Sequence, residues 1–339
     1  MYKRLEVLLA FALLTAVGLG GCVEVDSYQH KQTAQVDLYE LSPSILNAPQ
    51  YVAIDQGFFS DEGLTVELTA VKTIEDLITA LQEGQADIGL AGAEVSIKAY
   101  QAGQEDHLVN FSQLTQREGS FLLGRQREYD FQWERLLGKT IMIGYSEGKQ
   151  VMVLDYILKQ HGLNPEQDVD IIIDLNAVEN FTEGMGDYVV VREPEVTCLG
   201  KAGVAYPQAS LGTCTDYIAD TVYMARKSIL KNNPDMIQKF SNAVYQAQLW
   251  MDSHSPDETA RAIAPFFLNI EANDLAEAVG RYQVQNTWRV TTVMDEQSFD
   301  LLQEIICRSE KMDAMVESSL LIDNRFTRKA VLSTGGKHY

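Results

Sequence analysis

The chain has 339 residues, of which 46% are hydrophobic and 22% are charged, and its formal net charge is −21 at pH 7. A chain of this length can bury more than one hydrophobic core. Such an acidic surface repels nucleic acid and anionic lipid headgroups, which excludes nucleic-acid binding as the main function. The sequence has no G-x-x-x-x-G-K-[ST] loop, so it lacks that ATPase motif.

The amino-terminal residues have the features of an export signal. Two basic residues precede an apolar run over residues 7–19, which is shorter than the roughly 20 residues that a membrane-spanning helix needs. We expect residues 1–21 to be a signal peptide. The small residues before Cys22 resemble a lipoprotein cleavage site, so we expect Cys22 to be acylated and residues 22–34 to form a tether on the extracytoplasmic face of the membrane. A free or structural Cys22 beside an ordinary cleavage site is the alternative.

Strands and helices alternate over residues 35–122, which we expect to form the first lobe. Period-2 and helical hydrophobic patterns, with Gly and Pro between them, mark the segments. The predicted strands cover 35–41, 64–69 and 87–90, and the predicted helices 48–56, 74–82 and 95–101. This β-α-β-α-β order predicts a mostly parallel sheet.

A second lobe of the same kind is expected over residues 123–220. The polar segment 115–120 separates two apolar runs and marks a place where the chain could cross between lobes. The predicted strands of this lobe cover 140–143, 169–173 and 188–191, and its helices 151–161 and 178–183. Each lobe is therefore predicted to be a mostly parallel sheet flanked by helices.

Long amphipathic helices are predicted from residue 221 onward. Pro234 suits a first helical position, and Ser255 with Glu258 has the spacing of a capping box. We expect residues 221–330 to return to the first lobe and cover it, and residues 331–339 to form a disordered tail.

Two stretches a hundred residues apart share one pattern. In both, a helix ends in Glu-Gly, an Asp follows, and a short buried strand then leads to a carboxylate: Asp87 and Glu94 in one stretch, Asp187 and Glu193 in the other. This repeat predicts two similar α/β lobes whose loops face each other across a cleft. Chance similarity between two ordinary helix-strand units is the alternative.

Catalytic readings of the sequence are weaker. Residues 144–148 match the G-x-S-x-G nucleophile elbow around Ser146, but only His161 and His254 follow it in the folded region, and a Gly-rich turn before a helix explains the segment as well. The scattered histidines disfavour a metal centre, although Glu94, Asp187 and Glu193 could bind a hard cation if they converge.

The cysteines after Cys22 are odd in number and lack C-x-x-C spacing, which makes a zinc site improbable. Cys198 and Cys214 could pair in an exported protein or remain buried thiols.

The segment from Ala48 to Phe59, APQYVAIDQGFF, resembles the opening signature of the SsuA-like group of type II substrate-binding proteins of ABC importers. The segments LAGAE, QLTQR and GDY through EP are also similar to that group, and the resemblance extends over roughly residues 36–330. The group includes carriers of thiamine pyrimidine precursors, alkanesulfonates, taurine and nitrate. The resemblance implies a two-lobed periplasmic-binding-protein fold with the ligand between the lobes.

The resemblance also implies which loops bind the ligand. The expected ligand-binding residues are Ser42, Asn47, Ala93, Glu94, Gln116, Arg117, Gly144, Tyr145, Ser146, Asp187, Tyr188 and Glu193. The two tyrosines could stack on a flat heterocycle and the carboxylates could accept hydrogen bonds from amino groups. Alternatively, Asp187 caps a turn, Tyr188 belongs to the core, and Arg117 pairs with a local acid such as Glu118.

With three acids and one Arg on these loops, an amino-bearing solute such as a thiamine pyrimidine is favoured over sulfonate, taurine or nitrate. Pyrimidine-binding relatives tend to carry an aromatic residue where this chain has Leu46 and Asn47, so a stacking partner could be missing. The expected protein is a monomeric, cofactor-free receptor that passes its solute to an ABC permease and its ATPase. An exported enzyme on the same scaffold and a ligand-binding subunit of a sensor are the alternatives.

Overall fold

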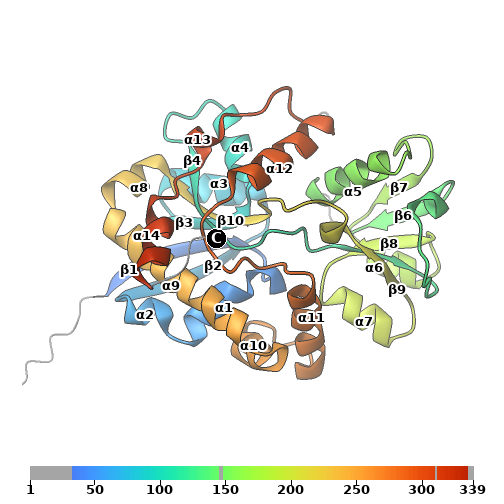
Figure 1. The fold of residues 1–339 in the computed structure, drawn as a ribbon, viewed down its shortest axis with the longest axis horizontal. Helices are drawn as coiled ribbons and strands as arrows, with labels where there is room; N and C mark the ends of the chain where they lie inside the picture. Colours follow the sequence, from blue (N-terminus) through green and yellow to red (C-terminus); the bar gives the residue numbers. More distant parts are fainter. Residues whose placement is uncertain (1–32, 145–147, 310, 335–339) are drawn as a thin grey trace, which may run out of the picture. The chain divides into compact units, whose positions relative to one another are not determined.

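The computed structural model describes residues 33–144, 148–309 and 311–334, which belong to one compact unit beginning at Thr33. Within this unit, ten strands form two separate five-stranded sheets (Figure 1). We call the sheets with their helices lobe I and lobe II. Cys22 and the predicted signal peptide lie outside the described residues.

The sheet of lobe I has the strand order β2-β1-β3-β10-β4. The first three of these strands pair in parallel, and β10 runs antiparallel to both of its neighbours. The strands are β1 (Ala34–Leu41), β2 (Leu64–Val71), β3 (Ile88–Gly92), β4 (Leu108–Gln113) and β10 (Thr221–Arg226). The sheet is therefore mixed, with β10 as its one reversed strand.

The sheet of lobe II repeats this arrangement with the order β7-β6-β8-β5-β9. Strands β7, β6 and β8 pair in parallel, and β5 is antiparallel to β8 and β9. The strands are β5 (Phe121–Gly124), β6 (Thr140–Ile143), β7 (Asp170–Ile173), β8 (Tyr188–Val191) and β9 (Tyr206–Ser210). In each lobe the reversed strand follows a chain crossing from the other lobe, through residues 114–120 or 211–220, which we call the crossovers.

The sequence repeat corresponds to this structural repeat. Strands β3 and β8 occupy the central position of their sheets, and each follows a helix, α3 (Ile74–Glu83) or α6 (Ala177–Thr182). The repeated Asp has one structural role in both lobes, because Asp87 accepts a hydrogen bond from the backbone N–H of Asp37 (3.1 Å) and Asp187 accepts one from Thr140 (3.0 Å). Each Asp therefore fixes the amino end of the central strand to its neighbour. The predicted two-lobed α/β fold is confirmed.

Alternating side chains of the strands enter two hydrophobic clusters. Val36 and Leu38 of lobe I share one cluster with Val189 and Val191 of lobe II, whereas Val190 belongs to the other cluster. Both clusters thus draw residues from both sheets, as the period-2 alternation of a strand requires. The core is continuous between the lobes.

Helices cover both sheets. Those that precede residue 227, besides α3 and α6, are α1 (Ala48–Asp55), α2 (Phe58–Asp61), α4 (Glu94–Gln101), α5 (Lys149–Gln160) and α7 (Glu195–Lys201). Those that follow are α8 (Lys227–Asn232), α9 (Pro234–Ser253), α10 (Pro256–Ile263), α11 (Ala272–Val284), α12 (Glu296–Arg308), α13 (Ser318–Leu321) and α14 (Arg325–Ser333). Pro234 begins α9, and Ser255 and Glu258 form the predicted capping box of α10.

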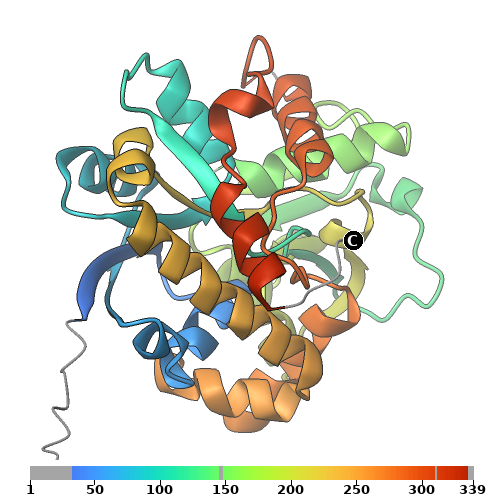
Figure 2. The same cartoon turned by 60° about the vertical axis from the view of Figure 1, so that its left-hand side comes forward.

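The carboxy-terminal segment differs from the prediction at three points. Residues 331–333, which were predicted to belong to a disordered tail, form the end of α14, and Val331 is buried. Residues 221–226 form strand β10 in the middle of the lobe I sheet, not a helix. Helix α9 packs on α1 and α14 in lobe I, but α11 also contacts α7 and α12 contacts α5, which belong to lobe II (Figures 1 and 2). The carboxy-terminal helices therefore tie the two lobes together.

Two further observations bear on the environment of the protein. None of the helices in the described part of the chain is long and apolar enough to cross a membrane. Cys198, Cys214 and Cys307 are free thiols.

Candidate functional site

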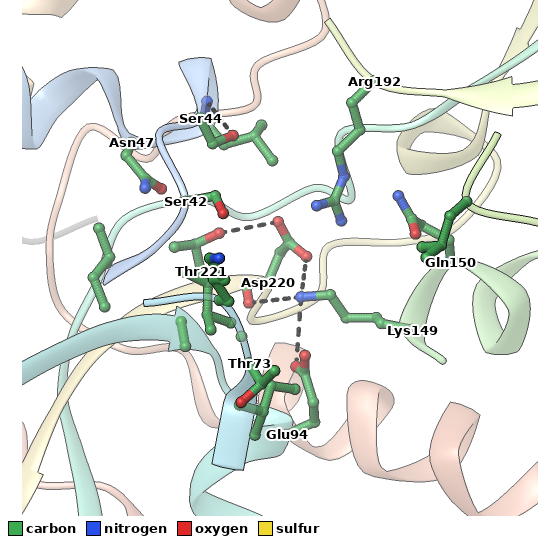
Figure 3. A pocket seen from close by; sticks show the side chains of 18 residues that line it. Ser42, Ser44, Asn47, Thr73, Glu94, Lys149, Gln150, Arg192, Asp220 and Thr221 are labelled. Atoms are coloured by element: carbon green, nitrogen blue, oxygen red, sulfur yellow. Dashed lines mark hydrogen bonds and ion pairs between the residues drawn. The ribbon is translucent and has the colours of Figure 1, made fainter. Parts of the chain in front are cut away.

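A cavity of about 380 Å³ lies between the two lobes at the carboxyl ends of β1 and β3 (Figure 3). Lobe I, lobe II and the second crossover all contribute to its wall. Its lining residues are Leu41, Ser42, Ser44, Leu46, Asn47, Lys72, Thr73, Ile74, Leu90, Ala91, Gly92, Glu94, Lys149, Gln150, Leu175, Arg192, Asp220 and Thr221. This is the place where open α/β sheets bind ligands.

An ion-pair network joins the lobes inside this cavity. Lys149, the first residue of α5 in lobe II, places its Nζ 2.6 Å from Asp220 Oδ1 and 3.4 Å from Glu94 Oε2. It also donates a hydrogen bond to the backbone carbonyl of Asp220 (3.1 Å). Glu94 begins α4 of lobe I, and Asp220 directly precedes β10. One ammonium group therefore holds carboxylates of lobe I and the second crossover against lobe II.

Burial favours the neutral forms of Lys149 and Asp220, but the opposite charges around them outweigh this effect. Burial would lower the pKa of Lys149, yet Asp220 and Glu94 raise it above its usual value. Burial would raise the pKa of Asp220, yet Lys149 and Arg192 hold it below its usual value. The pair is thus ionised at neutral pH.

A glycine makes room for the Glu94 carboxylate. If Gly92 carried a Cβ, that atom would lie 2.1 Å from Glu94 Oε1. Only Gly at this position allows the carboxylate to fold back over the end of β3 and face Lys149.

A second cation, Arg192, follows β8 and extends into the cavity from lobe II (Figure 3). Its Nη2 is 2.8 Å from Oε1 of Glu118, a fully buried carboxylate of the first crossover. Glu118 also accepts hydrogen bonds from Ser120 N (2.6 Å) and Ser120 Oγ (2.9 Å), and Gln150 donates to the same hydroxyl (3.1 Å). Although burial opposes it, the charges of Glu118 and Asp220 raise the pKa of Arg192, so this guanidinium is fixed and charged.

The lobe I wall presents small polar groups held by a buried acid. Asn47 donates to Glu40 Oε2 (2.8 Å), as do Gln50 (2.9 Å) and the Tyr51 hydroxyl (2.9 Å). The same hydroxyl accepts a hydrogen bond from Ser44 N (3.3 Å). Glu40 is 1% exposed, and it positions Asn47 and Ser44 at the cavity from behind.

The cavity brings together three of the residues predicted from the sequence: Ser42, Asn47 and Glu94. Ala93 is buried beside Glu94, and Gly144 ends the described part of its loop without lining the cavity. Tyr145 and Ser146 lie outside the described residues.

Gln116 and Arg117 lie in the first crossover, as predicted, but they do not line this cavity. Gln116 donates to the backbone carbonyl of Asn286 (3.0 Å). Arg117 donates to the carbonyl of Gly212 (2.6 Å), and its guanidinium lies 4.3 Å from the centre of the Tyr217 ring. Both side chains therefore connect the crossovers with neighbouring segments.

Asp187 and Tyr188 do not reach the cavity either. Asp187 lies at the amino end of β8, whereas the cavity lies at the carboxyl ends of the strands. The Tyr188 hydroxyl donates to Glu128 Oε1 (3.0 Å), and burial raises the pKa of Tyr188 to about 12. Their roles are those of a turn clamp and a core residue.

Glu193 also faces away from the cavity. It accepts hydrogen bonds from Thr197 N (3.0 Å) and Thr197 Oγ1 (3.2 Å), and Arg281 Nε lies 2.5 Å from its Oε1. The carboxylate stabilises the first turn of α7 and ties it to α11. Glu94, Asp187 and Glu193 thus stand in three different places, and the residues that the structure describes contain no group of three or more side chains that could hold a metal ion.

The two histidines that the sequence offered as a base for a nucleophile elbow, His161 and His254, both stack on tryptophans. His161 follows α5, whose 12 residues span about 18 Å, so it lies a whole helix away from the turn at Gly148. Its ring stacks on Trp133, and the ring of His254 stacks on Trp250.

The sequence did not single out Lys149, Gln150, Arg192 or Asp220. Lys149 directly follows the Gly-rich turn of residues 144–148, a signal that could have identified it. Arg192 directly precedes Glu193. The prediction assigned Glu193 to the ligand, whereas Arg192 lines the cavity. Asp220 precedes a strand that the pattern did not predict, so nothing in the sequence indicated its place.

The fold and the inter-lobe cavity define the class of the protein as a two-lobed periplasmic-binding-protein fold. Solved structures of this class superpose over most of the chain. One is the ligand-binding component of an ABC-type import system from Staphylococcus aureus. The alignment covers 88% of this chain and 99% of that chain, with a TM-score of 0.71 and 14% sequence identity. Another is the alkanesulfonate-binding protein SsuA from Xanthomonas axonopodis pv. citri. The alignment covers 86% of this chain and 99% of that chain, with a TM-score of 0.66 and 15% sequence identity.

Within this class, the chain belongs to the NMT1/THI5 like family, whose model matches residues 46–259. It is 33% identical to YtlA of Bacillus subtilis (strain 168), a candidate binding protein by its name, over 89% of this chain and 91% of that one. It is 23% identical to the 4-amino-5-hydroxymethyl-2-methylpyrimidine phosphate synthase THI13 of Saccharomyces cerevisiae, over 62% of this chain and 64% of that one.

The buried acid behind the cavity predicts a pH-dependent stability. Burial raises the pKa of Glu40 from 4.5 to about 7, although its hydrogen-bond donors act in the opposite direction. Because the folded-state pKa exceeds the unfolded value, this group stabilises the fold most at low pH, and the contribution is lost as the pH rises through about 7.

We expect urea unfolding of the wild type to lose about 2 to 3 kcal/mol more between pH 5 and pH 8 than unfolding of the Glu40→Gln variant, which cannot titrate there. Because the free energies of unfolding at the two pH values are compared within each protein, the pH-independent effect of the substitution on stability cancels. Equal pH dependence in both proteins would contradict the assignment.

Proposed function

We propose that this protein is the solute receptor of an ABC importer, which closes its lobes around a small polar organic molecule and delivers it to a membrane permease and its ATPase. The observation that carries the proposal is the charged cavity at the lobe boundary, whose wall includes residues of both lobes and a crossover. Enclosure by two hinged lobes is a common way to bind a solute reversibly. The names of YtlA, SsuA and the Staphylococcus aureus component, which describe binding proteins, support the same role.

The cavity favours a cargo that carries an amino group. Glu94 and Asp220 offer carboxylate oxygens, and Ser42 and Asn47 add neutral polar groups. Two of the three lining cations are already engaged, Lys149 with Asp220 and Arg192 with Glu118, and the third, Lys72, is exposed to solvent. A sulfonate or nitrate would meet both carboxylates as well as Arg192, so an amino-bearing molecule is the better match.

A thiamine pyrimidine is the leading candidate, because it offers an amino donor to the acids and ring nitrogens as acceptors to Arg192 and Gln150. The name of the yeast relative THI13 points to the same compound class. None of the lining residues in the described part of the chain is aromatic. We therefore propose that Tyr145, which lies outside the described residues and precedes Lys149 by four residues, supplies the stacking ring, and that Gly144 and Ser146 also bind the cargo.

We test the cargo by thermal denaturation of residues 33–339 against 4-amino-5-hydroxymethyl-2-methylpyrimidine, alkanesulfonates, taurine, nitrate and ester substrates. A cargo at about 100 times its Kd adds about 2.7 kcal/mol and raises Tm by about 4 °C for a chain of this length. We expect the pyrimidine to give this shift, Glu94→Gln to reduce it strongly, and Asp187→Asn, whose carboxylate lies away from the cavity, to keep it.

Two results would contradict this proposal in different ways. A shift with nitrate or a sulfonate alone that depends on Arg192 would replace the cargo class. Turnover of an ester or of the pyrimidine would favour the exported enzyme. If the protein is instead the ligand-binding subunit of a sensor, it has no permease partner. Copurification with the permease distinguishes an importer from a sensor.

We further propose that the protein is anchored outside the cytoplasmic membrane through acylated Cys22 after removal of residues 1–21. Two or more acyl chains on one residue hold a protein firmly at a bilayer. We expect the full chain to partition into the detergent phase of Triton X-114, and the Cys22→Ser variant to partition into the aqueous phase. Aqueous partition of both proteins would contradict the anchor.

A further inference from the structure

A second cavity, of about 360 Å³, shares no lining residue with the first. Its wall includes one residue from each crossover, Gln116 and Tyr217, together with the carboxy-terminal end of α9 and the segment that follows α11. A molecule in this cavity would therefore touch both segments that join the lobes. Gln116, which the sequence analysis assigned to ligand binding, lies here.

Polar groups of this wall lack the partners that their chemistry requires. Gln248 is 2% exposed, and its Nε2 donates to the Leu114 carbonyl (3.0 Å), but its buried Oε1 has no hydrogen-bond partner among the described residues. Such an acceptor is costly to leave unpaired. The contacts within the described residues therefore leave the polar groups around this cavity incompletely satisfied.

Arg289 supplies the opposite chemistry. Its Nε donates to the Thr291 carbonyl (3.3 Å) and its Nη1 to Gln116 Oε1 (3.3 Å), both neutral acceptors at long distances. None of the carboxylates that the structure describes forms an ion pair with it. Burial lowers the pKa of Arg289, and the charge of Asp295, which forms no ion pair with it, offsets this only in part. A carboxylate ligand would provide a counter-ion.

Two further features of the wall fit a built site. Asp252 is exposed at the end of α9 and pairs with no cation in the described part of the chain, so it can accept an ammonium group. Asn286 has a φ of 55°, in the left-handed region, and its carbonyl accepts the hydrogen bond from Gln116. Asn is among the few non-Gly residues that adopt this conformation readily, and the hydrogen bond from Gln116 fixes it here.

We propose that this cavity is a second binding site, for a small zwitterion of the amino-acid type. Arg289 binds the carboxylate of the ligand, and Asp252 binds its ammonium group. The volume of the cavity corresponds to about 12 water molecules, enough for a small amino acid.

The position of this site couples it to the first cavity. Trp288 lines the second cavity, and its Nε1 donates to the carbonyl of Leu46 (2.9 Å), which lines the first. Together with Gln116 and Tyr217, this contact lets a ligand at the second site bias the separation of the lobes. The effect on cargo affinity rests on the proposed receptor function and is reciprocal by thermodynamic linkage. Binding itself does not depend on that function.

The experiment uses amide NMR of residues 33–339, which form one compact unit, with L-alanine, propionate and ethylamine as matched probes. L-Alanine carries both charged groups, and each of the other probes carries one. We expect L-alanine to shift the amides of Gln116, Tyr217 and residues 286–290 in a saturable manner. Propionate and ethylamine should bind about tenfold or more weakly, because each loses one charge-assisted contact.

Variants then separate the two sites. Arg289→Gln and Asp252→Asn should each weaken L-alanine binding about tenfold or more, and Asp187→Asn, which lines neither cavity, should leave it unchanged. If Arg289→Gln fails to fold, the exposed Asp252→Asn decides the question. Absence of any shift at about 50 mM, well above millimolar affinities, would overturn the proposal. Shifts confined to the first cavity would also overturn the second site while leaving the receptor function intact.

Discussion

The ion-pair network of Lys149, Asp220 and Glu94 is the interaction on which this structure depends. Lys149 belongs to lobe II, Glu94 to lobe I, and Asp220 to the crossover between them. Lys149 is 7% and Asp220 is 1% exposed, so each ion has lost most of its water. Such ions are tolerated in the interior only as partners, and removal of one partner typically costs about 3 to 5 kcal/mol. The lobes can therefore approach each other only when these charges pair.

This constraint also explains how the wall can serve a solute. The lobes contribute opposite charges, so their approach creates a polar cavity with fixed donors and acceptors. Arg192 is held by Glu118 of the first crossover, and Asn47 is held by Glu40 behind the lobe I wall. Groups fixed in this way bind a ligand without a large loss of conformational freedom. The crossovers carry residues of this wall and of the second cavity, so both cavities lie beside the segments that join the lobes.

Most of the fold was predictable from the sequence, whereas the site was predictable only in part. Strand β6 and the capping box of α10 follow local patterns, and the Glu-Gly-x-x-Asp repeat identified the two lobes because one structural clamp, Asp87 or Asp187, recurs in each. Strand β10 was missed because its place in the sheet depends on a chain crossing, which no local pattern encodes. For the same reason, Lys149 and Asp220, 71 residues apart, gave no joint signal. Asp187 and Glu193 were predicted to bind the ligand but do not line the cavity, because in a sequence a carboxylate looks the same whether it clamps a strand, caps a helix or faces a ligand.

The measurement that tests this account most directly is small-angle X-ray scattering of residues 33–339 without ligand, in the wild type and in the Lys149→Met and Lys139→Met variants. Lys139 is the matched control, because its ion pair with Asp187 is exposed and lies within lobe II. If Lys149 holds the lobes together, Lys149→Met leaves two carboxylates unpaired, water enters between the lobes, and the radius of gyration increases beyond that of the wild type and of Lys139→Met. Equal radii for all three proteins would contradict the account.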